Sequence, residues 1–104
     1  MLKVTFKKPL IFDWDEGNDQ KNRIRHNVSI MEAEDIFFDS NRLILDDIKH
    51  SSDAEQRFIL IGYNKQRRML FIIFTIRGKK VRIISARDTN RKEETLYEKA
   101  ISTA

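Results

Sequence analysis

The chain has 104 residues, a length that fits one domain with its own hydrophobic core and no crosslinks. It contains no cysteine, which excludes disulfides and thiolate metal sites. No apolar run is long enough to span a membrane, and the N-terminal residues lack the apolar core of a signal peptide, so we expect a cytoplasmic protein.

Charge is distributed unevenly along the chain. The net charge is +4, but residues 1–64 carry 9 Lys/Arg against 12 Asp/Glu, whereas residues 65–104 carry 11 against 4. The first part is therefore at −3 and the second at +7. This asymmetry suggests a polyanionic partner, nucleic acid first, although a solvated surface whose charges only aid solubility would have the same composition.

The first part of the chain predicts a short strand followed by two helices. Apolar and polar residues alternate over 2–6, which is the period of a strand. A capping-box pattern predicts a helix over about 14–25. Ser29 and Glu32 form a clearer capping box, which predicts a second helix over about 30–38.

The second part predicts an antiparallel sheet and a closing helix. Short apolar runs occupy residues 43–45, 58–63, 69–76 and 81–86. The links between the last three are too short for a crossover, so neighbouring strands must be antiparallel. The run Leu70 to Phe74 is apolar on both faces and predicts a central strand. Asn90, with Glu93 three residues later, begins the last helix.

These elements predict one domain over residues 1–104 with an α+β fold. It would contain two N-terminal helices, a four-stranded antiparallel meander and a C-terminal helix.

A polar loop over 46–57 joins the first two predicted strands of the meander, and such loops often carry functional residues. His50 could carry a proton near neutral pH, and Glu55 could act as a base or orient Arg57. Alternatively, Glu55 and Arg57 form a structural ion pair and His50 is a solvated loop residue. The aspartates of the loop have no spacing typical of a metal site, so we expect neither a metal nor another cofactor.

Two arginines bracket the last predicted strand, in the stretch Arg82-Ile83-Ile84-Ser85-Ala86-Arg87. Burying an unpaired guanidinium is costly, so each arginine either has an internal partner, such as Asp15 or Asp35, or faces an anion. In an ideal strand the two would point to opposite faces, so they share a phosphate only if the strand ends before Arg87. Tyr97 on the last helix is preferably a core residue, although its hydroxyl could reach a substrate.

Several motifs follow one another along residues 12–98: Phe12-Asp13-Trp14-Asp15, Asn22, Arg25-His26-Asn27-Val28-Ser29, Glu34 to Asp39, His50 with Glu55-Gln56-Arg57, Gly62, Arg82 to Arg87, and Glu94 with Tyr97-Glu98. Their order and spacing together resemble the BrnT family, toxins of bacterial type II toxin–antitoxin pairs. The resemblance implies a RelE-like fold and a metal-independent endoribonuclease that arrests translation. It also implies a BrnA-like ribbon-helix-helix antitoxin, with two toxins and two antitoxins in a complex that binds DNA only through the antitoxin.

Such a ribonuclease needs a proton acceptor for the 2′-hydroxyl, cations for the phosphate and an acid for the leaving oxygen. With the resemblance in view, we assign catalysis to His50, Glu55, Arg57, Arg82, Arg87 and Tyr97, and RNA contacts to Arg77, Lys79, Lys80 and Arg91. His50 and Glu55 would be the acid–base pair and the arginines the cations. The alternative is a non-catalytic RNA-binding or protein-interaction module that uses the same basic face.

Overall fold

The computed structural model describes residues 10–14 and 26–103. The strand expected over 2–6 and, apart from Trp14, the helix expected over 14–25 lie outside the described residues. No helix in the described part of the chain is long and apolar enough to cross a membrane.

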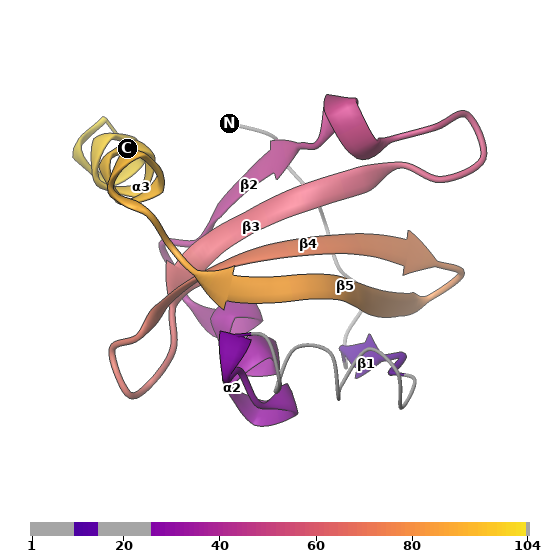
Figure 1. Ribbon diagram of the computed structural model, residues 1–104, viewed down its shortest axis with the longest axis horizontal. Helices are drawn as coiled ribbons and strands as arrows, with labels where there is room; N and C mark the ends of the chain where they lie inside the picture. The colour runs from indigo at the N-terminus through magenta and orange to yellow at the C-terminus, as the bar shows by residue number, and fades with distance from the viewer. Residues whose placement is uncertain (1–9, 15–25, 104) are drawn as a thin grey trace.

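The described residues form a five-stranded sheet with α2 against one face and α3 against one end of the other (Figure 1). In chain order the elements are β1 (Ile11–Phe12), α2 (Ile30–Asp35), the 3₁₀ helix η1 (Ile36–Phe38), β2 (Leu43–Asp46), the 3₁₀ helix η2 (Ile48–His50), β3 (Arg57–Tyr63), β4 (Met69–Arg77), β5 (Lys80–Asp88) and α3 (Arg91–Ser102). The strand order is β1-β5-β4-β3-β2. Strands β2 to β5 form the predicted antiparallel meander, and β4 is the middle strand, as its two-faced apolar run predicted.

The prediction of a purely antiparallel, four-stranded sheet was wrong, because β1 adds a fifth strand that runs parallel to β5. The pairing continues past β1, where the N–H of Asp13 donates to the Val81 carbonyl at 2.8 Å. β1 thereby satisfies backbone groups that an edge strand would leave unpaired. Two apolar residues are too few to show a periodicity, so the sequence pattern gave no sign of this strand.

Of the three capping boxes that the sequence predicted, the two that lie in the described residues are present. The hydroxyl of Ser29 accepts the Glu32 N–H at 3.2 Å, and the Glu32 carboxylate accepts the Ser29 N–H at 3.2 Å. Asn90 and Glu93 make the corresponding pair of bonds at 2.9 and 3.0 Å. Each pair of bonds satisfies two backbone N–H groups at the start of a helix. Residues close in sequence therefore determine where α2 and α3 begin.

The two faces of the sheet are covered to different extents. The larger core lies under α2 and η1, where Ile36 and Phe37 pack against residues such as Ile72 and Phe74. On the opposite face, Tyr97 of α3 covers only one end of the sheet, above Leu43, Ile61 and Met69. The other end of this face is not covered by a helix of the described chain (Figure 1). Arg57, Thr75 and Arg82 lie there on neighbouring strands.

Asp39 and Gly62 fix the position of α3. Oδ2 of Asp39 accepts the Tyr97 hydroxyl at 2.7 Å and the Tyr63 N–H at 2.9 Å. A Cβ atom at Gly62 would lie only 2.9 Å from the same oxygen. Residue 62 must therefore be glycine if the Asp39 carboxylate is to reach both the sheet and the helix.

A β-bulge at Ile84 decides where the arginines of β5 point. Ile83 and Ser85 pair with consecutive residues of β4, so Ile84 has no partner there. The extra residue reverses the alternation of side chains along the strand. Arg82 and Arg87 consequently lie on the same face, although the strand does not end before Arg87 as we expected for such an arrangement.

Candidate active site

A row of polar residues crosses the uncovered end of the sheet. Arg57, Thr75 and Arg82 are cross-strand neighbours on β3, β4 and β5. Beside Arg57, the N–H of Asp47 donates to the Arg57 carbonyl at 2.9 Å, and beside Arg82 the carboxylate of Asp13 lies 3.6 Å from the guanidinium. The spacing of strands puts the backbones of the two arginines about 10 Å apart. We call this region, with the 46–57 loop and the β4–β5 turn, the loop end.

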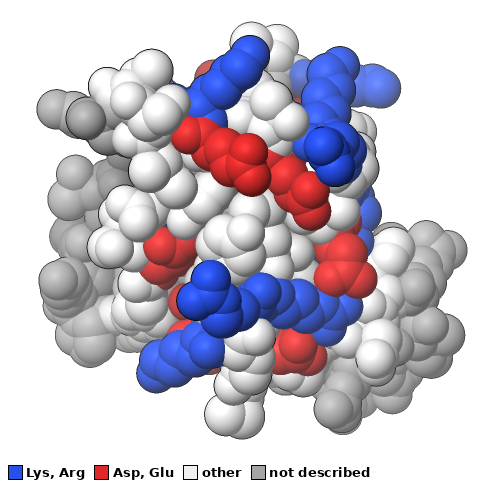
Figure 2. Space-filling model, turned by 90° about the vertical axis from the view of Figure 1, so that its left-hand side faces the viewer, with Lys and Arg blue, Asp and Glu red and all other residues white. Residues whose placement is uncertain are grey.

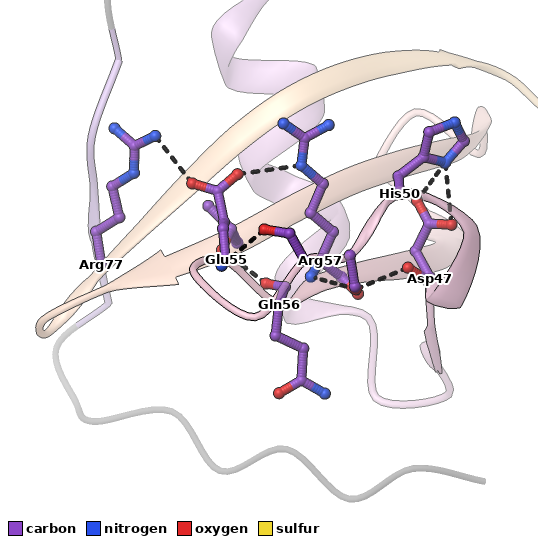
Figure 3. Close-up of polar contacts among 9 residues, drawn as sticks. Asp47, His50, Glu55, Gln56, Arg57 and Arg77 are labelled. Atoms are coloured by element: carbon purple, nitrogen blue, oxygen red, sulfur yellow. Dashed lines mark hydrogen bonds and ion pairs between the residues drawn. The ribbon is translucent and has the colours of Figure 1, made fainter.

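Glu55 joins two guanidinium groups at the loop end. Its carboxylate accepts Nε of Arg57 at 3.1 Å and Nη2 of Arg77 at 3.0 Å (Figure 3). These hydrogen bonds, the one from Arg77 first and that from Arg57 second, lower the pKa of the Glu55 carboxyl. Glu55 therefore stays ionised at neutral pH, where it orients cations and has no proton to give.

The two arginines keep unused donors. Among the described residues, Arg57 donates from its side chain only through Nε and Arg77 only through Nη2. A guanidinium carries five N–H groups in a planar fork, so each retains donors that match the oxygens of a phosphate. The Glu55–Arg57 ion pair that we considered as an alternative is present, but one carboxylate shared by two guanidiniums leaves the group positively charged.

In the close-up, Glu55 lies on one side of Arg57 and His50 on the other (Figure 3). A carboxylate holds the His50 ring. Nδ1 lies 2.9 and 3.1 Å from the two carboxylate oxygens of Asp47. Because a carboxylate only accepts hydrogen bonds, Nδ1 carries the proton and Nε2 is the basic nitrogen. The His50 side chain is 49% exposed, and Nε2 makes no hydrogen bond within the described residues, so this nitrogen is available to a ligand.

Ser51 connects the histidine turn to the arginine strand. Its hydroxyl donates to the Asp47 carbonyl at 2.7 Å and accepts the Arg57 N–H at 2.9 Å. The turn that carries His50 is thereby tied to the first residue of β3. Figure 3 shows the polar groups of Arg77, Glu55, Arg57 and His50 on the same side, whereas Gln56 points away from them.

Arg87 and Tyr97, which we also expected to be catalytic, lie at the other end of the sheet, which we call the α3 end. Arg87 donates to both carboxylate oxygens of Glu93, at 2.9 and 2.8 Å, and its guanidinium lies 4.1 Å from the centre of the Phe71 ring. Burial raises the pKa of the Glu93 carboxyl, but the hydrogen bonds from Arg87 and the Asn90 backbone lower it further, below its ordinary value. Burial and then the Asp39 hydrogen bond raise the pKa of the buried Tyr97 hydroxyl, as befits the core residue we preferred.

Arg82 and Arg87 do not share a site. Five residues of extended chain separate them by about 15 Å, which is too far for both to hold one phosphate. Each has a carboxylate neighbour among the described residues, as one interpretation of the sequence required: Asp13 for Arg82 and Glu93 for Arg87. Asp15, suggested as a partner, lies outside the described residues. Asp35, suggested as a partner, instead accepts the backbone N–H of Lys65 at 2.6 Å.

The comparisons with known proteins bear on this arrangement. A model of the family described as "Ribonuclease toxin, BrnT, of type II toxin-antitoxin system" matches residues 14–93. The chain belongs to the BrnT family. The crystal structure of the Brucella abortus ribonuclease toxin, BrnT, is similar in fold, with a TM-score of 0.59 and 20% sequence identity over 79% of this chain and 99% of that one. A search of curated protein sequences found no match.

The expected RNA-contacting residues are divided between the two ends. Lys79 lies in the turn before β5, and Lys80 pairs across the strands with Arg77, so both are at the loop end. Arg91 begins α3, at the other end. Figure 2, which faces the α3 end, shows basic and acidic side chains interleaved there, with no uniformly basic surface. Within this BrnT-family domain, the basic second part of the chain thus contributes cations to both ends of the sheet, with Arg77, Lys79, Lys80 and Arg82 at the loop end and Arg91 at the α3 end.

Two polar residues that make several contacts in the structure, Asp47 and Arg68, were not singled out from the sequence. The buried Asp47 carboxylate stands three residues before His50, and that spacing on a tight turn was the available signal. Arg68 donates to Asp88, to Glu32 and to the carbonyl of Asn27. The bond to Asp88 first, and then that to Glu32, raises the pKa of Arg68. Nothing local predicted the contacts of the Arg68 guanidinium, because its partners are at least 20 residues away. In the described part of the chain, no three His, Asp or Glu side chains gather as a metal site would require.

Proposed function

We propose that this BrnT-family chain is a cytoplasmic endoribonuclease toxin that cleaves RNA without a metal ion and so arrests translation. The observation that carries the proposal is the loop end itself. The imidazole of His50, whose Nε2 makes no hydrogen bond in the described chain, points to the same side as two guanidiniums that share one carboxylate (Figure 3). The family description supplies the substrate class, and the unused N–H donors of Arg57 and Arg77 suit a phosphate.

In the proposed reaction, Nε2 of His50 takes the proton of a ribose 2′-hydroxyl. The 2′-oxygen bonds to the adjacent phosphorus, and the bond from phosphorus to the 5′-oxygen breaks. Water protonates the leaving 5′-oxygen, and the imidazolium later returns its proton to solvent. The products are a 2′,3′-cyclic phosphate and a 5′-hydroxyl end.

The arginines would stabilise the charge that develops on the phosphate. In the close-up Arg57 lies between His50 and Glu55, so we assign its Nη groups as the cationic donors to the reacting phosphate (Figure 3). Arg77, Arg82, Lys79 and Lys80 extend the positive charge across the loop end and would hold the flanking phosphates. Such preorganised donors commonly contribute about 2–4 kcal/mol each to transition-state stabilisation.

The family also implies a neutralising partner. A BrnA-like ribbon-helix-helix antitoxin, in a complex of two toxins and two antitoxins, would cover the loop end with acidic side chains, and any DNA would be bound by the antitoxin. Co-purification with the product of the adjacent gene, followed by light scattering, tests this partnership. A toxin that remains monomeric beside that product contradicts it.

The decisive experiment compares Arg57→Ala with Arg67→Ala, which removes the same charge from an exposed position in the β3–β4 turn. Each purified protein is incubated with an RNA oligomer in EDTA. We expect the first variant to cleave about a hundredfold or more slowly than the wild type, and the second to be unaffected. Both should unfold at the wild-type temperature.

Two results would contradict the proposed function. Wild-type cleavage that requires a divalent metal overturns the proposed chemistry. Salt-dependent RNA binding by the wild type without cleavage supports the non-catalytic binding module instead.

A further inference from the structure

Asp47 is unusual among the acidic residues of the loop end, because its carboxylate is buried. The side chain is 6% exposed, whereas that of its partner His50 is 49% exposed. Within the described structure, the imidazole of His50 is the only group that makes a hydrogen bond to the carboxylate. Burying a carboxylate is costly, so an arrangement that orients it toward one ring nitrogen calls for an explanation.

Helix capping does not explain the burial. Asp47 occupies the N-cap position of η2, but its side chain accepts no backbone N–H there. The backbone of the residue is held separately, through its N–H to Arg57 and through its carbonyl to Ser51. The backbone of Asp47 therefore makes the structural hydrogen bonds, and these bonds fix the position of its carboxylate without using the carboxylate oxygens.

We propose that Asp47 is the positioning residue of the active site, which holds His50 in the tautomer and orientation that present Nε2 to the RNA 2′-hydroxyl. This inference deepens the proposed ribonuclease function and rests on it for the identity of the substrate. A carboxylate on Nδ1 keeps the proton on that nitrogen and stabilises the imidazolium that forms when Nε2 takes a proton. The proton stays on the imidazole, and Asp47 is not itself protonated.

Ser51 links the Asp47–His50 pair to Arg57. Because its hydroxyl bridges the Asp47 carbonyl and the Arg57 N–H, the Asp47 carboxylate is held in register with the first residue of β3. The imidazole and the guanidinium are therefore placed by one hydrogen-bonded turn. A loop histidine without these contacts would rotate freely and lose the proximity that catalysis needs.

The kinetic test compares Asp47→Asn with Asp46→Asn. Asp46 is the neighbouring residue and is exposed, and among the described residues its carboxylate accepts one hydrogen bond, from Gln56 at 3.4 Å. We expect Asp47→Asn to lower kcat about a hundredfold or more while KM changes little, because the ring can then adopt the wrong tautomer. Asp46→Asn should cleave RNA at the wild-type rate.

Non-additivity separates positioning from a general structural role. The double variant Asp47→Asn with His50→Gln should be no slower than His50→Gln alone, since Asp47 acts only through the ring. A double variant slowed by the product of the two single effects would overturn the proposal. So would an Asp47→Asn variant whose KM rises while kcat is unchanged.

A measurement on the wild-type protein keeps the proposal independent of folding defects and of the substrate. Nitrogen-15 NMR of the free protein reports which ring nitrogen of His50 is protonated, with the signals assigned by His50→Gln. We expect the Nδ1–H tautomer in the wild type and in Asp46→Asn, and its loss in Asp47→Asn. An Nε2–H tautomer in the wild type overturns the positioning role even if RNA is cleaved. A wild type that cleaves no RNA but shows the Nδ1–H tautomer contradicts the ribonuclease function and leaves the Asp47–His50 geometry supported.

Discussion

The loop end and the α3 end contain the same residue types in different proportions. At the α3 end, Arg87 has Glu93 to itself, and Arg68 has both Glu32 and Asp88. At the loop end, Arg57 and Arg77 share Glu55. Arg87 and Arg68 are therefore matched or outnumbered by their carboxylates, whereas the two arginines around Glu55 outnumber theirs.

This difference shows how to tell a structural arginine from one that can serve a ligand. Arg87 uses both Nη groups on Glu93 and stacks on Phe71, so its bonding capacity is consumed within the fold. Arg57 contacts Glu55 through Nε alone among the described residues, so its fork remains available. Both arginines make an ion pair, so the existence of a pair does not distinguish them. They differ in the number of N–H donors that remain available to a ligand.

Arg82 provides the strongest test of the comparison. Arg82→Ala should reduce RNA cleavage about a hundredfold or more, a loss of about 2–4 kcal/mol in transition-state stabilisation, because it removes a cation of the polar row. The neighbouring Asp13 side chain is 37% exposed and can be solvated, so we expect the domain to stay folded. Cleavage rates and thermal unfolding of one purified variant give both quantities. Full activity with a much lower unfolding temperature would assign Arg82 to the structural class.

Arg87→Ala should give the opposite result. It leaves the Glu93 carboxylate, which is 12% exposed, without its guanidinium and uncovers one face of Phe71. We expect the free energy of unfolding to fall by about 1–3 kcal/mol, less than for a fully buried pair because the Arg87 side chain is 36% exposed. Chemical denaturation measures this loss. The cleavage rate per folded molecule should be unchanged, and a loss of cleavage without a loss of stability would erase the distinction between the two ends.

Local signals in the sequence predicted the elements well. Short links determined the antiparallel neighbours, and the capping residues Ser29 and Asn90 determined where the two described helices begin. The grouping of His50, Glu55 and Arg57 was also accessible, because all three belong to one loop and its boundary. In each case the interacting residues are close in sequence, so spacing alone carries the information.

Features that depend on distant contacts were not accessible. The bulge at Ile84 puts Arg82 and Arg87 on one face, yet nothing in the run of apolar residues shows which one lacks a partner. Arg77 reaches Glu55 across 22 residues, and β1 reaches β5 across almost 70. These contacts follow from sheet register, which is a property of the folded chain rather than of any local pattern.

The smallest expected difference between the two ends is in how the free energy of unfolding depends on pH. The pKa of Glu93 is lowered from its ordinary value of 4.5 despite burial, and that of Glu55 is lowered by Arg77 and then Arg57. A lowered pKa in the folded state means that each carboxylate stabilises the fold above about pH 4.5 and that this contribution is lost as the pH falls through the lowered value.

Denaturant unfolding of Glu93→Gln and Glu55→Gln between about pH 6 and 3 should therefore show a shallower loss of stability than in the wild type. The change should be smaller than that caused by Arg87→Ala, because protonation leaves the side chain and its packing in place. At neutral pH, only Glu55→Gln should also slow RNA cleavage, since only that carboxylate orients the cations of the loop end. If Glu93→Gln loses stability in acid as steeply as the wild type, the Arg87–Glu93 pair does not stabilise the α3 end. If Glu55→Gln cleaves RNA at the wild-type rate, the orientation of Arg57 and Arg77 does not depend on their shared carboxylate.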